Sequence, residues 1–203
     1  MRSLFIFALV FGAFPLLSQP KSFSFVFLNK KTDAVQLSKE ESEKIMGGHM
    51  ANINRLAKEG KLISAGPFEG GGGIFILNTT SVDEAKRWLD TDPGVKADRW
   101  NIEILPYAPH IRSACAVKEP YEMLLYQFIR YRSSDKKVAT DFIGSMQQTG
   151  NIITAGFFGD REGIVVLREK VAKEILEADP TVKSGHLTMD IKDLYIAKGS
   201  FCE

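Results

Sequence analysis

The sequence contains an internal repeat, and this feature constrains the fold more than any other. Residues 60–77 read GKLISAGPFEGGGGIFIL, and residues 150–167 read GNIITAGFFGDREGIVVL. The Ala-Gly pair at 65–66 recurs at 155–156, an offset of 90 positions, and the Asp-Pro pair at 92–93 recurs at 179–180, an offset of 87. Because repeats of this kind mark repeated structural units, we expect two modules, residues 21–108 and 121–203, joined by a linker at 109–120.

Both copies show the same order of expected elements. In the first copy, apolar and β-branched runs predict strands at 22–29, 61–68, 74–78 and 100–106. Two Ser-x-x-Glu sequences, typical of helix N-termini, predict helices over about 38–59 and 81–92. The second copy repeats this order at 121–131, 135–149, 151–158, 163–168, 171–178 and 187–197. The order βαββαβ predicts an α+β, ferredoxin-like module with an antiparallel sheet and both helices on one face.

The helix-free face of such a sheet is apolar and has to be covered. The tandem copy can supply that cover. We therefore expect the two ferredoxin-like modules to pack sheet to sheet as an internal pseudo-dimer, forming an α/β barrel.

Residues 1–20 are expected to lie outside this fold. A single positive charge precedes an apolar run at 4–17, which is short for a bilayer span and typical of the hydrophobic region of a secretory signal. A buried N-terminal strand or helix is the alternative. A signal peptide at 1–20 implies a secreted or periplasmic protein with no stable membrane association after cleavage.

Two cysteines occur in the chain, Cys115 and Cys202, 87 positions apart and each after the last expected strand of its copy. In an oxidising compartment this pair could form a disulfide between the linker and the C-terminal segment. The alternative is two free thiols, and the sequence leaves both open.

Several function classes lack support in the sequence. The 26 Lys and Arg residues against 25 Asp and Glu form no basic stripe, so we expect no nucleic-acid partner. The run Gly70–Gly73 lacks the Gly-Lys-Ser/Thr ending of a phosphate loop. The three histidines and two cysteines show no metal-ligand spacing, and there is no dinucleotide fingerprint, so we expect no metal and no cofactor. Further self-association of the chain stays open.

One titratable residue distinguishes the two copies. His49 lies within the apolar stripe of the first helix at helical spacing, whereas the second copy has Ala139 in its place. Asp92 falls on the apolar side at the end of the second helix, where an unpaired charge would be costly. Since both helices cover the same side of the sheet, the Asp92 carboxylate can orient the His49 ring. A core histidine and a structural turn before Pro93 are the alternatives, and Asp179, retained in the second copy, agrees in part with the latter.

The residues of the first copy resemble the YCII-related domain family. The similarity rests on the helical His49, the strand at 62–67, the glycine-rich turn, the helix with Trp88, and Asp92-Pro93. It covers nearly all of the first copy and, more weakly, the second. The resemblance implies a dimeric α/β-barrel fold in which the family's His and Asp, here His49 and Asp92, are catalytic.

Most members of this family have no known reaction, a few act in the degradation of chlorinated aromatics, and fold relatives include muconolactone isomerases. The resemblance also places the substrate beside Gly66, Pro67 and Trp88. The second copy departs from the family pattern at Ala139 and at Phe157, which stands in the place of Pro67.

Three functional hypotheses remain. The first is a cofactor-free enzyme in which His49 transfers a proton and Asp92 orients it, as isomerisation, lactone chemistry or elimination would require. The second is a binding module whose cavity holds a small-molecule ligand without turnover. The third is a structural exported domain with His49 packed in its core.

Overall fold

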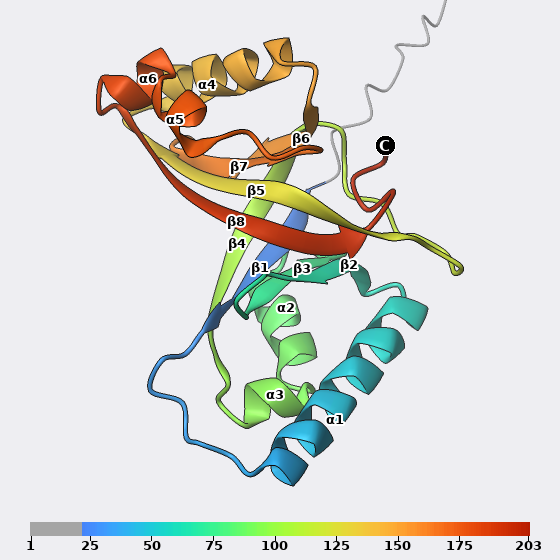
Figure 1. The fold of residues 1–203 in the computed structure, drawn as a ribbon. Helices are drawn as coiled ribbons and strands as arrows, with labels where there is room; N and C mark the ends of the chain where they lie inside the picture. The colour runs from blue at the N-terminus through green and yellow to red at the C-terminus, as the bar shows by residue number, and fades with distance from the viewer. Residues whose placement is uncertain (1–21) are drawn as a thin grey trace, which may run out of the picture.

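A computed structural model describes residues 22–203, which form an antiparallel sheet of eight strands with helices on its outer faces (Figure 1). The expected signal peptide at 1–20 lies outside the described residues. Within the described part of the chain, none of the helices is both long and apolar enough to cross a membrane.

The two halves have the same order of elements. The first contains β1 (Phe23–Lys30), α1 (Lys39–Lys58), β2 (Leu62–Pro67), β3 (Gly73–Leu77), α2 (Val82–Leu89), α3 (Pro93–Lys96) and β4 (Trp100–Ile111). The second contains β5 (Met123–Ser133), α4 (Lys136–Gln148), β6 (Ile152–Phe157), β7 (Glu162–Leu167), α5 (Lys173–Glu177), α6 (Pro180–Lys183) and β8 (Leu187–Ala197). Each half is therefore an α+β, ferredoxin-like unit with one short helix more than predicted.

That additional helix corrects the predicted end of the second helix. In the first half α2 ends at Leu89, and Asp92 is the N-cap of the separate helix α3. Asp179 has the same position before α6. Proline disfavours helical geometry in the preceding residue but is well placed at the first position of a helix, so each Asp-Pro pair ends one helix and starts another.

The sheet runs through both halves in the order β2-β3-β1-β4-β6-β7-β5-β8. β4 and β6 join the halves, with Ala108 opposite Phe157 and Pro109 opposite Gly156. The predicted linker at 109–120 was therefore too long, because residues 109–111 continue β4 in order to pair with β6. At the other end of the sheet, β2 meets β8 through a bridge between Phe68 and Leu194.

The core lies in three layers, and β1 shows why. All of its residues from Phe23 to Leu28 are buried. Phe25 and Phe27 pack between the two halves with Phe128 and Phe158, whereas Leu28 packs beneath the helices of its own half. The corresponding helix-side core of the second half lies beneath α4–α6. Alternate residues of a strand face opposite sides, so a central strand covered on both sides is apolar throughout.

An ionic contact also crosses between the halves. Arg130 of β5 donates two hydrogen bonds to the Glu103 carboxylate of β4, at 2.7 and 2.8 Å, and its guanidinium lies 4.2 Å from the centre of the Phe27 ring. Together with the aromatic layer, this contact fixes the position of one half against the other.

Candidate active site

Helix α1 carries His49 to the inner side of the first half. The helix begins with a complete capping box, in which the Ser38 hydroxyl accepts from the Glu41 backbone N–H and the Glu41 carboxylate accepts from the Ser38 N–H. Its apolar stripe buries Leu56 against the sheet. His49 lies in this stripe and is only 7% exposed.

Asp92 is fully buried at the start of α3. Its Oδ1 accepts hydrogen bonds from the backbone N–H groups of Gly94 and Val95, at 2.8 and 3.3 Å. These groups have no partner within the helix, and a negative charge at this end of a helix is favourable. Asp92 faces the core because it caps α3, and not because it continues the apolar side of α2 as the sequence suggested.

The other carboxylate oxygen joins Asp92 to α1. Nδ1 of His49 lies 2.8 Å from Oδ2 of Asp92, and the Asn52 side-chain amide donates to the same oxygen at 3.0 Å. Asn52 is held in turn by Arg55, whose guanidinium donates to the Asn52 side-chain oxygen at 2.8 Å. The structure thus brings together the two residues predicted as a pair and adds a third.

These contacts determine the charge of Asp92 and the tautomer of His49. Burial raises the pKa of the Asp92 carboxyl, but the hydrogen bond and charge of His49, with the bonds from Asn52 and Gly94, outweigh burial and leave this pKa below its usual value. Asp92 is therefore ionised and can only accept. Nδ1 of His49 must then carry the hydrogen, which in a neutral ring leaves the lone pair on Nε2.

Two aromatic rings hold the imidazole. His49 stacks on Phe75 of β3, with 5.8 Å between ring centroids and 14° between planes, and lies 4.8 Å from the Trp100 ring. Within the described residues no side chain or backbone group bonds to Nε2 of His49. A fixed ring with one nitrogen bonded to a carboxylate and the other unbonded can donate or accept a proton there.

His49 borders a cavity of about 1110 Å³, at the upper end of the range for small-molecule sites. The walls are largely apolar, and Met46, Met50 and Ile53 of α1 contribute to them together with Trp100. Among the lining residues, Glu119 is the single acidic one. Five basic side chains also line the cavity: Lys30, Lys31, Lys58, Arg99 and Lys118.

The structure separates the residues predicted to contact substrate. Gly66 and Pro67 at the end of β2 line the cavity. Trp88, the third predicted substrate contact, is not among the residues that line it. It packs against the apolar core beneath the helices, with the Lys61 ammonium 5.7 Å from its ring. Trp88 is on α2, whose apolar side packs against the sheet.

Sequence reasoning missed three cavity or network residues on α1 and one on β4. Asn52 is a polar residue three positions after His49, in the same apolar stripe, and that spacing was an available signal. Met46 and Met50 are half-exposed on α1. Trp100 begins β4 and gave no signal of its own, because its contact with His49 arises only when β4 pairs beside β1.

The second half retains the aspartate without the network. Ala139 and Phe142 occupy the places of His49 and Asn52 and are fully buried. Asp179 caps α6 and accepts from the Thr181 backbone N–H and hydroxyl, at 2.9 and 2.6 Å. Its hydrogen bonds are thus supplied locally, and no partner from α4 reaches it in the described residues.

The remaining cysteines and histidines lie elsewhere. A disulfide joins Cys115 to Cys202, with 5.1 Å between their Cα atoms. His110 and His186 are exposed. Among residues 22–203, no group of three or more His, Cys, Asp or Glu side chains is arranged to hold a metal ion.

Comparison with solved structures concerns the fold alone. The chain is similar to a provisionally assigned chlorite dismutase, with 10% identity, a TM-score of 0.51, and 88% of this chain and 96% of that one covered. It is also similar to two provisionally assigned monooxygenases: one from Lactobacillus acidophilus, with 14% identity, a TM-score of 0.44 and coverage of 86% and 93%, and one from Fusobacterium nucleatum, with 7% identity, a TM-score of 0.46 and coverage of 90% and 94%. These likenesses concern the α+β fold alone.

The family comparison is more specific and concerns the first half. Residues 23–107 match the YCII-related domain, a range that contains both His49 and Asp92 and ends before the second half begins. No curated protein matches the sequence.

Proposed function

We propose that the first half of this protein is a small-molecule enzyme in which His49 transfers a proton and Asp92 orients and stabilises it. The observation that carries the proposal is the 2.8 Å contact between Nδ1 of His49 and the fully buried, ionised carboxylate of Asp92. The His49 ring that makes this contact also borders a large cavity. A histidine that is hydrogen-bonded to a buried carboxylate and borders a cavity is a typical arrangement of catalytic sites.

The proposed step is a proton transfer at Nε2 of His49. A bond from hydrogen to a ligand carbon or oxygen breaks, its electron pair stays on the ligand, and Nε2 takes the proton. Asp92 stabilises the imidazolium that results, and His49 returns the proton to another ligand atom or to water. Isomerisation, lactone chemistry and elimination all require such a step.

The lining of the cavity favours an apolar organic anion as ligand. Methionine, isoleucine and tryptophan side chains provide apolar contact. Five basic side chains, of which Lys31 is paired with Asp98, line the cavity together with one acidic side chain. A site lined by one sign of charge raises the local concentration of ligands of the opposite sign. We therefore expect ligand affinity to fall as ionic strength rises.

The proposal extends to architecture and location. We propose that the two halves form an internal pseudo-dimeric α/β barrel, which the pairing of β4 with β6 and the bridge between β2 and β8 support. We also propose that residues 1–20 direct export, because the Cys115–Cys202 disulfide suits an oxidising compartment. Fractionation of its own host followed by N-terminal sequencing tests the export proposal, and protein confined to the cytosol with an intact N-terminus contradicts it.

The test of function begins with a ligand. A library of small organic acids and matched neutral compounds is screened for thermal stabilisation of the protein, since binding to the folded state raises its stability. Compounds that stabilise are then incubated with the protein and analysed for turnover by mass spectrometry and NMR.

For a compound that is turned over, we expect His49→Ala to lower kcat by about 10²- to 10⁴-fold, the usual contribution of a general acid or base. The affinity of the His49→Ala variant for this compound should differ little from that of the wild type. If His49→Ala lowers only the melting temperature and turnover persists, His49 is a core residue and the proposed mechanism is wrong.

A further inference from the structure

The cavity beside His49 is not enclosed by the first half alone. Tyr121, Met123, Ala197 and Ser200 also line it. Met123 and Ala197 are opposite each other at the ends of β5 and β8, whereas Tyr121 and Ser200 lie just beyond those ends. One wall of a cavity in the first half therefore comes from the segment between the halves and from the chain after β8.

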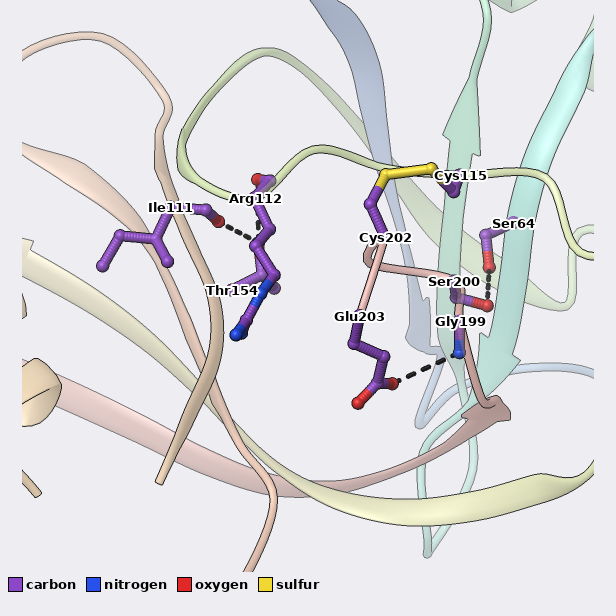
Figure 2. Close-up of a disulfide and its surroundings, with 9 residues drawn as sticks. All are labelled: Ser64, Ile111, Arg112, Cys115, Thr154, Gly199, Ser200, Cys202 and Glu203. Carbon is purple, nitrogen blue, oxygen red and sulfur yellow. Dashed lines mark hydrogen bonds between the residues drawn. A yellow bond between two sulfur atoms is a disulfide. The ribbon is translucent and has the colours of Figure 1, made fainter. Parts of the chain in front are cut away.

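The residues of this wall are fastened to one another. The Cys115 N–H donates to the Ser200 carbonyl at 2.8 Å, and the Lys198 N–H donates to the Glu122 carbonyl at 2.8 Å. The disulfide between Cys115 and Cys202 closes the same pair of segments, as Figure 2 shows. We call residues 115–122 and 197–202 together the cavity wall.

A buried side-chain hydrogen bond attaches the cavity wall to the first half. The Ser64 hydroxyl of β2 donates to the Ser200 hydroxyl at 2.8 Å, and these residues are 8% and 1% exposed (Figure 2). Two buried hydroxyls that lose each other leave unsatisfied polar groups, which is costly. Ser64 and Ser200 both line the cavity, so the contact lies at the ligand's boundary.

Besides stabilising the fold as a whole, the disulfide restrains the cavity wall locally. Phe201 is fully buried in the core between the halves and anchors residues 197–202. Without the disulfide, residues 115–122 would be held to that segment mainly by two backbone hydrogen bonds, and residues 118–120 are exposed. Segments with few buried contacts open locally at low free-energy cost. A cross-link between the two segments removes most of those open states.

We infer that the Cys115–Cys202 disulfide holds the cavity wall in place and thereby determines ligand affinity at the His49 cavity. The inference rests on the proposed function only in taking this cavity as the ligand site. Ser64 and Ser200 are then positioning residues, because they fix the cavity wall against β2.

Hydrogen–deuterium exchange of the full chain tests the inference without a ligand. In the double variant Cys115→Ser/Cys202→Ser, amides of residues 62–67 and 115–122 should exchange faster than in the wild type, by at least about 5-fold, the lower end of ordinary coupling between sites. Unchanged exchange in both segments overturns the inference.

Affinity is measured with 8-anilinonaphthalene-1-sulfonate, an apolar anion that matches the cavity lining, at a temperature where every variant is folded by near-UV circular dichroism. The double variant should bind this probe at least about 5-fold more weakly. Ser200→Ala keeps the disulfide and should weaken binding by a smaller factor. If the double variant does not fold, the Ser200→Ala variant is used for the hydrogen–deuterium exchange test in its place. Exchange of residues 62–67 in Ser200→Ala at the same rate as in the wild type then overturns the inference.

Leu176→Ala is the matched control. Leu176 is fully buried beneath the helices of the second half, in a separate cluster from the cavity wall. Its truncation should lower the melting temperature and leave probe affinity unchanged. Equal weakening in Leu176→Ala and the double variant would mean that affinity follows overall stability, against the inference. Since no turnover is measured, the cavity-wall inference and the catalytic role of His49 can fail independently.

Discussion

At the scale of single residues, the account depends on how a fully buried carboxylate is kept charged. Asp92 receives hydrogen bonds from His49 and Asn52 on one oxygen and from Gly94 and Val95 on the other. Burying a charge without such partners would shift its pKa upward until the group became neutral. The four donors prevent this, and the charge in turn fixes the His49 ring.

The lowered pKa of Asp92 predicts how stability depends on pH. The folded carboxyl has a pKa below the ordinary 3.8, so near and below that pH the unfolded chain binds more protons than the folded one. The resulting stabilisation is fully present above about pH 4 and is lost as pH falls further. Urea unfolding from pH 6 to pH 2.5 should show a steeper acid loss in the wild type than in Asp92→Asn. Parallel curves would contradict this prediction.

Residue patterns predicted His49 and Asp92 as a pair but not the other bonds around them. A titratable residue in an apolar stripe is visible as a break in the helical pattern. Asn52 shows the same break, yet its role depends on α3, whose existence the Asp-Pro pair did not reveal. Trp88 shows another limit, since an aromatic residue on a helix gives no indication of which cavity its ring will border.

At the scale of elements, the site depends on the close approach of α1 and α3. A methyl group added at Gly48 would lie 2.8 Å from Cγ of Pro93, and one added at Gly94 would overlap the Trp100 ring. Each glycine permits an approach that no larger residue would allow, and together they bring Asp92 within reach of His49.

Two adjacent glycines of α1 provide a matched comparison. A methyl group at Gly47 meets nothing within 4 Å, so Gly47→Ala should raise the free energy of unfolding by about 0.5–1 kcal/mol through helix propensity. Gly48→Ala should lower it by about 1–3 kcal/mol through overpacking against Pro93. Chemical denaturation measures both. If the two substitutions have effects of the same sign, α1 and α3 are not packed as described.

Sequence patterns located the long elements well, because capping boxes and strand alternation are local signals. The capping box at Ser38 marks the start of α1, and β8 has the predicted bounds. The extension of β4 through residues 109–111 was not predictable locally, since it follows from pairing with a strand 40 or more residues further along the chain. Tertiary partners decide such boundaries.

At the scale of the whole molecule, the two halves are similar in fold but differ in the residues of the candidate site. Both have the same order of elements and an aspartate that caps a short helix, but the places of His49 and Asn52 are taken by Ala139 and Phe142 in the second. The second half contributes β5, β6, β7 and β8 to the continuous sheet and part of the cavity wall. The internal repeat made the similarity visible in the sequence, and Ala139 made the difference visible.

The disulfide should also stabilise the whole fold. It closes a loop with a sequence separation of 87 residues, for which the chain-entropy model gives about 4–5 kcal/mol. The double variant Cys115→Ser/Cys202→Ser should lose stability of this order in urea unfolding. Mass spectrometry of the unreduced wild type should show no free thiol. Two free thiols in the protein isolated from its native compartment would contradict the bridge.

The most direct test of the central claim compares the two capping aspartates. Asp92→Asn and Asp179→Asn make the same chemical change at equivalent places, and kcat is measured for a compound that the wild type turns over, with the melting temperature of each variant. Asp92→Asn should lower kcat by about 10- to 100-fold, as loss of a carboxylate that orients a functional histidine does in metal sites, and Asp179→Asn should leave kcat unchanged. Equal effects on kcat, or none from Asp92→Asn in a folded protein, would contradict the claim that His49 and Asp92 form the active centre.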